Sequence, residues 1–250
     1  MPTYDIIAQT TLSQGVTTIC RLTGQPVPAD AAGSTDPSTQ QMVEALNQSA
    51  SDLFAMRDWQ ELRQQLNLSI LADSQGQTEK AYDLPPDYGR FVDVTQWSTS
   101  QQWPAVGPIS PQGWIAYLVN KWTPVTSLYW QMRNDQLWFL APPFPTAQPF
   151  TAYYISRGYV RDQDDSTLFK NYANKNGDTF LLDGQLISLL GRVKWLEYKG
   201  FDSASAMRDF QTQYDSRAGS DEGALVYNLS GTTGMPLISS ANAPDTGYGS

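Results

Sequence analysis

The sequence predicts an α+β fold. We expect a helical bundle from N- and C-terminal helix pairs, with an inserted antiparallel β region and an extended C-terminal arm. Apolar residues recur at helical spacing near both ends of the chain, before residue 57 and from 178 to 217. Between these regions, short apolar and aromatic segments alternate with turn residues, as in antiparallel sheets. From Gly219 the chain is rich in Gly, Ser, Thr and Asn, a composition that forms no packed domain.

The length and composition suit one large domain or two small ones, because 250 residues with 40% hydrophobic side chains can bury a sizeable core. We expect four parts. They are an N-terminal helix pair at 1–59, the β region at 60–160, a helix hairpin that completes the bundle at 161–218, and the arm at 219–250.

The stretch 178–217 predicts two helices folded back on each other at Gly200. This glycine stands where a left-handed helix-ending residue belongs, just after two lysines that suit a helix C-terminus. So short a connection makes the two helices antiparallel neighbours. The expected apolar stripes are Leu182, Leu186, Leu189, Val193 and Leu196, broadened by Ile187, Leu190 and Trp195, on the first helix, and Ala206, Phe210 and Tyr214 on the second.

Two helices are expected at the N-terminal end. Apolar residues share one helical face over 4–22. A second helix starts at Asp36-Pro37, because an acidic N-cap followed by proline at the first helical position is a strong start signal, and it continues to about Met56.

Alternation and turn residues predict the strands of the β region. Arg133-Asn134-Asp135 between two aromatic segments indicates a compact β-hairpin. The pattern at 112–118 allows a helical turn, and the polar segment 161–177 is expected to be a loop. A short strand is expected to end in the proline turn of 82–88, and the other expected strands are 66–70, 91–94, 128–132, 136–140 and 150–155.

The charge and the missing residue types exclude several classes of function. There are 16 basic and 25 acidic residues, a net charge of -9, which argues against a sequence-reading nucleic-acid binder. The negative net charge remains compatible with an acidic surface past which DNA slides. Histidine is absent, so a Ser-His-Asp triad, a Cys-His pair and a His-ligated metal site are excluded. The single cysteine, Cys20, allows no internal disulfide.

Candidate chemistry is weak along the whole chain, and we expect no enzyme activity, cofactor or metal. A calcium-binding loop is one interpretation of Asp162, Asp164 and Asp165. However, Thr167 and Ala173 stand where an EF-hand needs glycine and glutamate. A solvated loop is the expected alternative. No Walker loop, Gly-x-Gly-x-x-Gly or Ser-x-x-Lys motif occurs.

The tryptophans of the β region offer the best alternative function. Aromatic platforms can bind sugars or bases, so a carbohydrate-binding or peptidoglycan-acting phage tail component stays open, with an exposed aromatic cleft as its expectation. The competing interpretation places the same rings in a small β core or a subunit interface. The residues concerned are Trp97, Trp103, Trp114, Trp122, Trp130 and Trp138.

Three segments, in this order, resemble the head-to-tail adaptor (connector) proteins of short-tailed bacteriophages. The first is the N-terminal helix pair with Glu44-Ala45-Leu46-Asn47 and Trp59. The second is Tyr82-Asp83-Leu84-Pro85-Pro86-Asp87, similar to a Tyr-x-Leu-Pro-x-Asp element. The third is Leu181 to Ile187, running on to Lys199-Gly200-Phe201-Asp202 and Asp209-Phe210. Gly184 departs from the family, which usually has an acidic residue there.

The resemblance implies a structural virion protein. It would form a ring, expected to be a dodecamer, in the neck between head and tail, and be made in the host cytoplasm during assembly. Its partners would be the portal ring, a tail nozzle or tail tube protein, other copies of itself and passing double-stranded DNA bound without sequence specificity. No membrane contact is expected, since no apolar run reaches the length of a membrane span.

Two sets of residues are expected to carry these contacts. An arm with little structure of its own would order only on the portal ring. Its apolar anchors would be Leu225, Val226, Tyr227 and Leu229. The helix hairpin would form a wall between neighbouring subunits, with Leu186, Leu189, Trp195, Tyr198 and Phe210 at the subunit interface.

Overall fold

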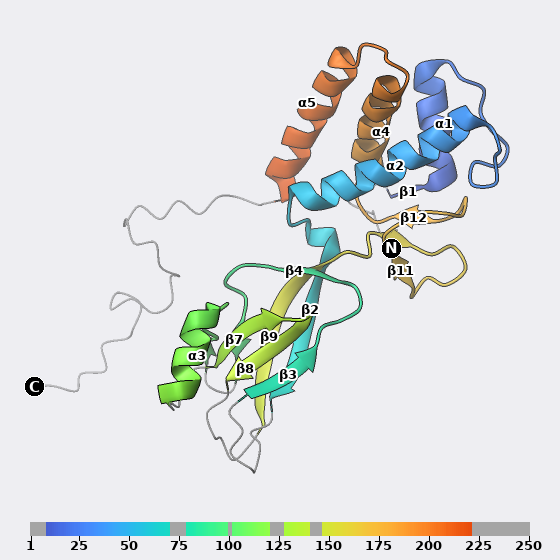
Figure 1. The fold of residues 1–250 in the computed structure, drawn as a ribbon. Helices are drawn as coiled ribbons and strands as arrows, with labels where there is room; N and C mark the ends of the chain where they lie inside the picture. Colours follow the sequence, from blue (N-terminus) through green and yellow to red (C-terminus); the bar gives the residue numbers. More distant parts are fainter. Residues whose placement is uncertain (1–8, 71–78, 100–101, 121–127, 141–146, 222–250) are drawn as a thin grey trace, which may run out of the picture.

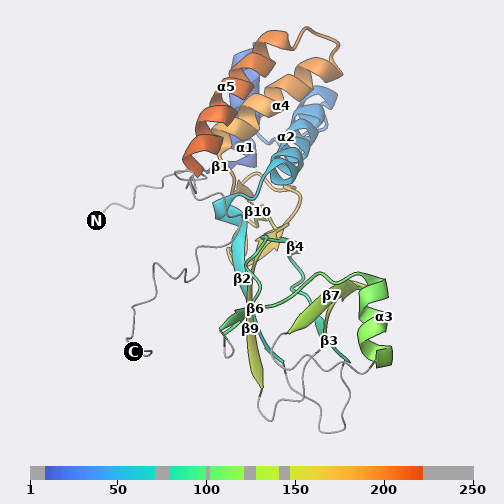
Figure 2. The same ribbon diagram turned by 90° about the vertical axis from the view of Figure 1, so that its left-hand side faces the viewer.

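The computed structural model of the chain describes residues 9–70, 79–99, 102–120, 128–140 and 147–221. These residues form two lobes, which Figures 1 and 2 show from two directions. The helical lobe comprises residues 9–62 and 158–221, and it combines four helices with a small sheet. The β lobe comprises residues 63–157, and it contains two further sheets and one helix.

The long helices of the helical lobe pack around one central helix, α4, which contacts the other three. The start of α2 is the predicted one: the Asp36 carboxylate accepts the N–H of Thr39 at 2.9 Å, and proline follows as the first helical residue. A short 3-10 helix, Gln60–Leu62, leads into the β lobe. The four helices are α1 (Leu12–Thr23), α2 (Pro37–Met56), α4 (Gly184–Tyr198) and α5 (Ala204–Asp221).

A small antiparallel sheet lies beneath these helices (Figure 1). Its strands run in the order β1-β12-β10-β11, and each is two residues long. The expected loop at 161–177 is therefore wrong at Arg161, which ends β10, and at Phe169–Lys170, which forms β11. Of the helix expected over 4–22, residues 4–8 lie outside the described residues, and the helix begins at Leu12, where Thr11 caps it. The strands are β1 (Thr10–Thr11), β10 (Val160–Arg161), β11 (Phe169–Lys170) and β12 (Thr179–Phe180).

The β lobe holds two antiparallel sheets and the helix α3 (Pro111–Asn120). In one sheet the order is β2-β9-β5-β6, with β4 also paired to β9, and in the other it is β3-β8-β7. Positive φ angles at Asn134 (53°) and Asp135 (56°) make the turn of the predicted β-hairpin. The strands are β2 (Arg63–Ile70), β3 (Glu79–Asp83), β4 (Tyr88–Phe91), β5 (Trp97–Ser98), β6 (Trp103–Pro104), β7 (Tyr129–Arg133), β8 (Gln136–Leu140) and β9 (Gln148–Ser156).

The predicted fold class is wrong. The described residues do form an α+β fold, but three antiparallel sheets with 12 strands and five α-helices dominate it, not a helical bundle with an inserted β region. The physical reason is the shortness of the strands. A two-residue strand such as β1 or β12 has no alternating pattern, so periodicity cannot predict it. The predicted boundaries between the four parts, at 59/60, 160/161 and 218/219, stay a prediction.

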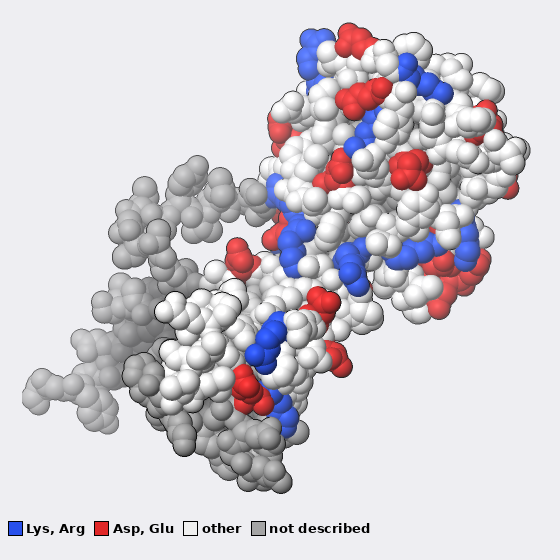
Figure 3. Space-filling view, viewed as in Figure 1, with Lys and Arg blue, Asp and Glu red and all other residues white. Residues whose placement is uncertain are grey.

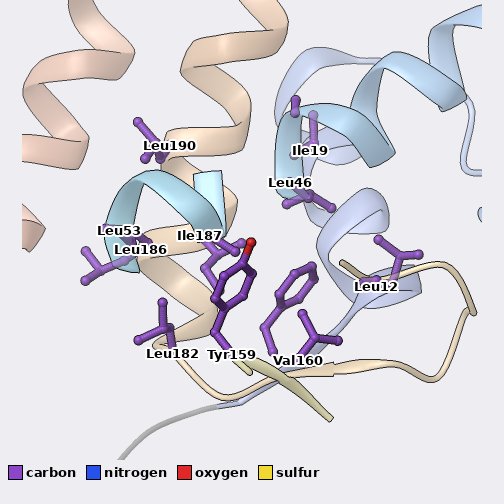
Figure 4. Packing of buried hydrophobic residues seen from close by; sticks show 14 of the residues in the cluster. Leu12, Ile19, Leu46, Leu53, Tyr159, Val160, Leu182, Leu186, Ile187 and Leu190 are labelled. Atoms are coloured by element: carbon purple, nitrogen blue, oxygen red, sulfur yellow. The ribbon is translucent and has the colours of Figure 1, made fainter. Parts of the chain in front are cut away.

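Two separate hydrophobic cores stabilise the lobes. In the helical lobe, side chains from α1, α2, α4 and β10 converge, as Figure 4 shows. Leu46 lies at the centre with 0% of its surface exposed. Glycines let the neighbouring helices approach it: a Cβ at Gly15 would lie 2.9 Å from Leu46 Cδ1, and one at Gly191 would lie 3.0 Å from Leu46 Cδ2.

Arg90 on β4 joins the two lobes. Its guanidinium forms a 2.6 Å ion pair with Asp58 and lies over the Phe54 ring at 4.8 Å. It also donates to the carbonyl oxygens of Phe54 (2.9 Å) and Arg57 (2.6 Å) at the end of α2. Carbonyl groups at a helix C-terminus have no partner within the helix, so a β-lobe arginine satisfies the end of α2.

Truncating Leu46 tests the helical-lobe core. We expect Leu46→Ala to lower the free energy of unfolding by about 3 kcal/mol, because the side chain is fully buried between helices that can only partly collapse. The control is Leu22→Ala, at a position that is 45% exposed, with an expected change within about 0.5 kcal/mol. Urea unfolding measures both, and similar losses in the two variants would contradict this account of the core.

Candidate functional site

The helix hairpin at Gly200 forms as predicted. Gly200 has a φ of 73°, the left-handed conformation in which glycine lacks a steric penalty. The Gly200 N–H donates to Glu197 O at 3.0 Å, and the Phe201 N–H donates to Leu196 O at 2.9 Å. These bonds satisfy carbonyl groups at the end of α4, and the chain turns directly into α5. The hairpin therefore presents a compact tip at one end of the helical lobe.

The five predicted interface residues lie in different environments. Leu186, Trp195 and Phe210 are buried in the chain's own core, where α1, α2 and α5 cover α4. Leu189 is only partly buried against that core. Tyr198 is 44% exposed and donates a hydrogen bond to Gln48 Oε1. The first three offer a neighbouring subunit little surface in this conformation, and the subunit interface as a whole stays a prediction.

Exposed apolar side chains gather at the hairpin tip. Phe201, beside Gly200, is 59% exposed, and Met207 in the first turns of α5 is also exposed. Together with Tyr198 we call them the tip patch. The sequence places Phe201 in the turn but predicts no contact for it, because a helical stripe describes helix faces and not the residues that join two helices.

The four predicted arm anchors, Leu225, Val226, Tyr227 and Leu229, lie outside the described residues. The described chain ends at Asp221, where α5 returns to the junction of the lobes. Asp221 is 3.6 Å from the Arg57 guanidinium and accepts a hydrogen bond from Gln60. The end of α5 is thus held at the junction, close to β4.

A polar network, not a solvated loop, occupies the segment between β10 and β12. The Lys170 ammonium lies 2.7 Å from both Asp162 and Asp178. The Lys175 ammonium lies 3.2 Å from Asp162 and 2.7 Å from Asp164. Lysines therefore occupy the positions around the carboxylates that calcium would need. Within the described ranges, no three acidic or thiol side chains are grouped as a metal site.

Asp178 is the most deeply buried acid of this network, with 0% of its side chain exposed. Burial would raise the pKa of its carboxyl, but hydrogen bonds from Lys170 and from the N–H groups of Lys175, Asn174 and Gln163 more than compensate, so the pKa lies below its usual value. The pKa of Asp162 also lies well below its usual range, chiefly because Lys170 donates to its carboxylate.

The tryptophans of the β region do not form an exposed row. Trp114 and Trp130 are buried, Trp97 and Trp138 are half-buried, and Trp103 is exposed. Trp122 lies outside the described residues. The aromatic platform expected for the glycan-binding alternative is therefore reduced, among the described residues, to one freely exposed indole.

Surface charge is mixed. The face of the molecule in Figure 3 carries both acidic and basic side chains over the helical lobe, and several basic side chains follow one another along the lower edge of that lobe, at the junction. Within the described ranges, no helix combines the length and the hydropathy of a membrane span.

Comparison with models of known protein families gives no match, and comparison with curated proteins gives no significant similarity.

Removing the Asp178 carboxylate tests the network. We expect Asp178→Ala to lower the free energy of unfolding at pH 7 by about 3 kcal/mol, because buried N–H groups lose their acceptor and Lys170 loses a counter-charge. The folded-state pKa is lowered, so this stability is present above the unfolded pKa of about 4 and is lost as the pH falls below it. Denaturant unfolding from pH 7 to about pH 2 should show the difference between the two proteins shrinking.

Asp164→Ala is the control. That side chain is 67% exposed, so its ion pair contributes little to the free energy of unfolding, and we expect its loss to change that energy little. A difference between the wild type and Asp178→Ala that stays constant down to low pH would contradict an ionised Asp178.

Proposed function

We propose that the chain is a structural virion protein, a head-to-tail adaptor that forms a ring between the portal and the tail and continues the DNA channel. The observation that carries the proposal is the tip patch. Tyr198, Phe201 and Met207 leave apolar surface exposed on the hairpin whose Lys199-Gly200-Phe201-Asp202 turn carries the family resemblance. Apolar residues clustered on a folded surface favour a protein–protein contact.

A ring built from identical subunits needs two different surfaces on each subunit that fit each other. The tip patch supplies one apolar surface on the helical lobe. The outer face of α3 on the β lobe supplies another, since Ile115 and Val119, one helical turn apart, are both exposed. Two patches on separate lobes therefore support head-to-tail association in preference to an isolated monomer.

The surface charge agrees with a channel through which DNA moves. A net charge of -9 does not attract phosphates. In this proposal the ring forms a passage for DNA and does not bind a particular sequence.

Truncation of the arm tests portal binding. We expect a variant that ends at Asp221 to lose co-pelleting with purified portal rings, because the apolar anchors from Leu225 to Leu229 are absent. A variant that ends at Leu229 is the matched control and should pellet like the full chain. Both keep α5 and its contact with Arg57. Equal pelleting by the two variants would show that residues 222–229 do not attach the protein to the portal.

A charge at the hairpin tip tests the subunit contact. We expect Phe201→Asp to abolish rings in electron micrographs of the protein mixed with portal, while the free energy of unfolding changes by less than about 1 kcal/mol, because this ring is largely exposed. Leu168→Asp, at a position that is 53% exposed and away from the hairpin, is the control. Normal rings with Phe201→Asp would remove the tip patch from the proposal.

A further inference from the structure

The strand β2 forms an open edge of the β lobe. It runs from the helical lobe into the β lobe (Figure 1), and its sheet has the order β2-β9-β5-β6. One side of β2 therefore pairs with β9, and no strand among the described residues pairs with the other side. The pairing with β9 continues over all eight residues, from Arg63 to Ile70, without a bulge. β2 thus presents a long, regular row of backbone groups that can accept a further strand.

The other outer strands of the described sheets are protected against such pairing. β1, β6 and β11 have two residues each, and the pairing of β4 with β9 contains a register shift. β3 carries Glu79, Lys80 and Asp83, and the backbone of Val106 already bonds to the outer side of β7. Short length, irregular pairing, charge and covering are the usual ways in which proteins block an edge. Among the described residues β2 has none of these protections, since Arg63 at its start is its one charged residue.

The backbone groups on this open edge belong to the odd-numbered residues of β2. Tyr153 of β9 accepts the Val92 N–H at 2.9 Å, so the backbone of Tyr153 points away from β2. Backbone groups of consecutive strand residues point in alternate directions, so Ala152 points toward β2, where it lies opposite Leu66. The residues on either side of Leu66 therefore turn their N–H and C=O groups to the open edge. They are Gln65 and Asn67, and Ser69 follows them in the same orientation.

The side chains of β2 divide between two faces. Leu66 and Ile70 are buried in the β-lobe core, and Leu68 is only partly buried against it. The odd-numbered side chains that follow Arg63 are exposed, polar and uncharged. A strand added at this edge would therefore meet an apolar face beside the core and a neutral polar face toward solvent.

We propose that β2 of a second copy of the chain occupies this edge, antiparallel to the first β2 and related to it by a two-fold axis at Asn67. Asn67 then lies opposite Asn67 of the second copy, and the two backbones exchange two hydrogen bonds there. Leu66 lies opposite Leu68 of the second copy, and the symmetry repeats this contact. Each partly buried Leu68 thus gains an apolar neighbour on the core face.

The sequence of β2 favours this occupant and this register. The paired residues, 64–70, carry no charge, so a second copy brings no like charges together. A shift of two residues in one direction would place Gln64 opposite Leu68. The opposite shift would shorten the paired part of β2. The register at Asn67 therefore combines apolar contacts on the core face with pairing along most of the strand.

The pairing differs from the head-to-tail contact of the proposed ring. Each chain has one β2, so two-fold pairing of this edge stops at two chains, whereas a ring needs two different surfaces on each subunit. The tip patch and the outer face of α3 take no part in it. The inference therefore does not rest on the proposed function. In the free protein the pairing covers an edge that would otherwise accept strands of other proteins.

Disulfide formation tests the register. Residues directly opposite in a hydrogen-bonded antiparallel pair have Cα atoms about 5.5 Å apart, which suits a disulfide. We therefore expect Asn67→Cys to form a covalent dimer under mild oxidation. Ser69→Cys is the matched control on the same face, because the two copies of residue 69 would lie about 14 Å apart, too far for a disulfide. The native Cys20 is 1% exposed and offers no competing thiol.

Sedimentation of the free, full-length protein tests whether association uses β2. We expect the wild type to approach twice the mass of one chain at about 100 μM protein and Asn67→Pro to associate at least about tenfold more weakly. Proline removes an N–H that points to the open edge, whereas the bonds to β9 come from the even-numbered residues. Asn67→Thr keeps this N–H and favours a strand, so it should associate like the wild type.

The outcomes decide the proposal. A wild-type protein that stays monomeric up to about 100 μM, or equal association of the wild type and Asn67→Pro, would overturn it. A covalent dimer of Ser69→Cys, or none of Asn67→Cys, would contradict the register. Association that Phe201→Asp abolishes would belong to the tip patch and not to β2. No portal is present in these experiments, so failure here leaves the pelleting result to decide the adaptor role by itself.

Discussion

The helical lobe depends on the buried carboxylate of Asp178. Its two oxygens accept the N–H groups of Gln163 (3.0 Å), Asn174 (2.7 Å) and Lys175 (2.8 Å), in addition to the ion pair with Lys170. Its own carbonyl accepts the N–H of Leu12 at 2.9 Å, where α1 begins. The hydrogen bonds of this one residue thus hold together the segment between β10 and β12 and connect it to the start of α1. A buried charge is tolerated here because every oxygen has a donor.

This segment also holds parts of the chain that are distant in sequence. Asn176 accepts the N–H groups of Ala31 (3.0 Å) and Ala32 (2.9 Å) from the connection between α1 and α2. Asn47 on α2 exchanges hydrogen bonds with the backbone of Ala173 (2.7 and 3.0 Å). Polar contacts of the segment between β10 and β12 therefore cover one side of the helical-lobe core, while leucines and glycines pack closely inside it.

The sequence predicts those parts of the fold whose signals are local. Asp36-Pro37, Gly200 and the Asn134-Asp135 turn each need one backbone conformation that few residue types provide, and the structure places all three as expected. The sheet under the helices could not be predicted in this way. Its strands are two residues long, and β1 pairs with β12 across more than a hundred residues, as in Thr10 with Phe180. The sequence of so short a strand contains no pattern that identifies the strand with which it pairs.

The same distinction applies to the candidate site. The apolar stripe on α4 predicts burial, and Leu186 and Trp195 are buried, but a stripe does not say whether the chain itself or another subunit covers it. In this chain α1, α2 and α5 cover most of it. The network around Asp162 was missed because its lysines come eight and thirteen residues later and reach it only after the segment folds. Tertiary contacts, and not local spacing, decided both cases.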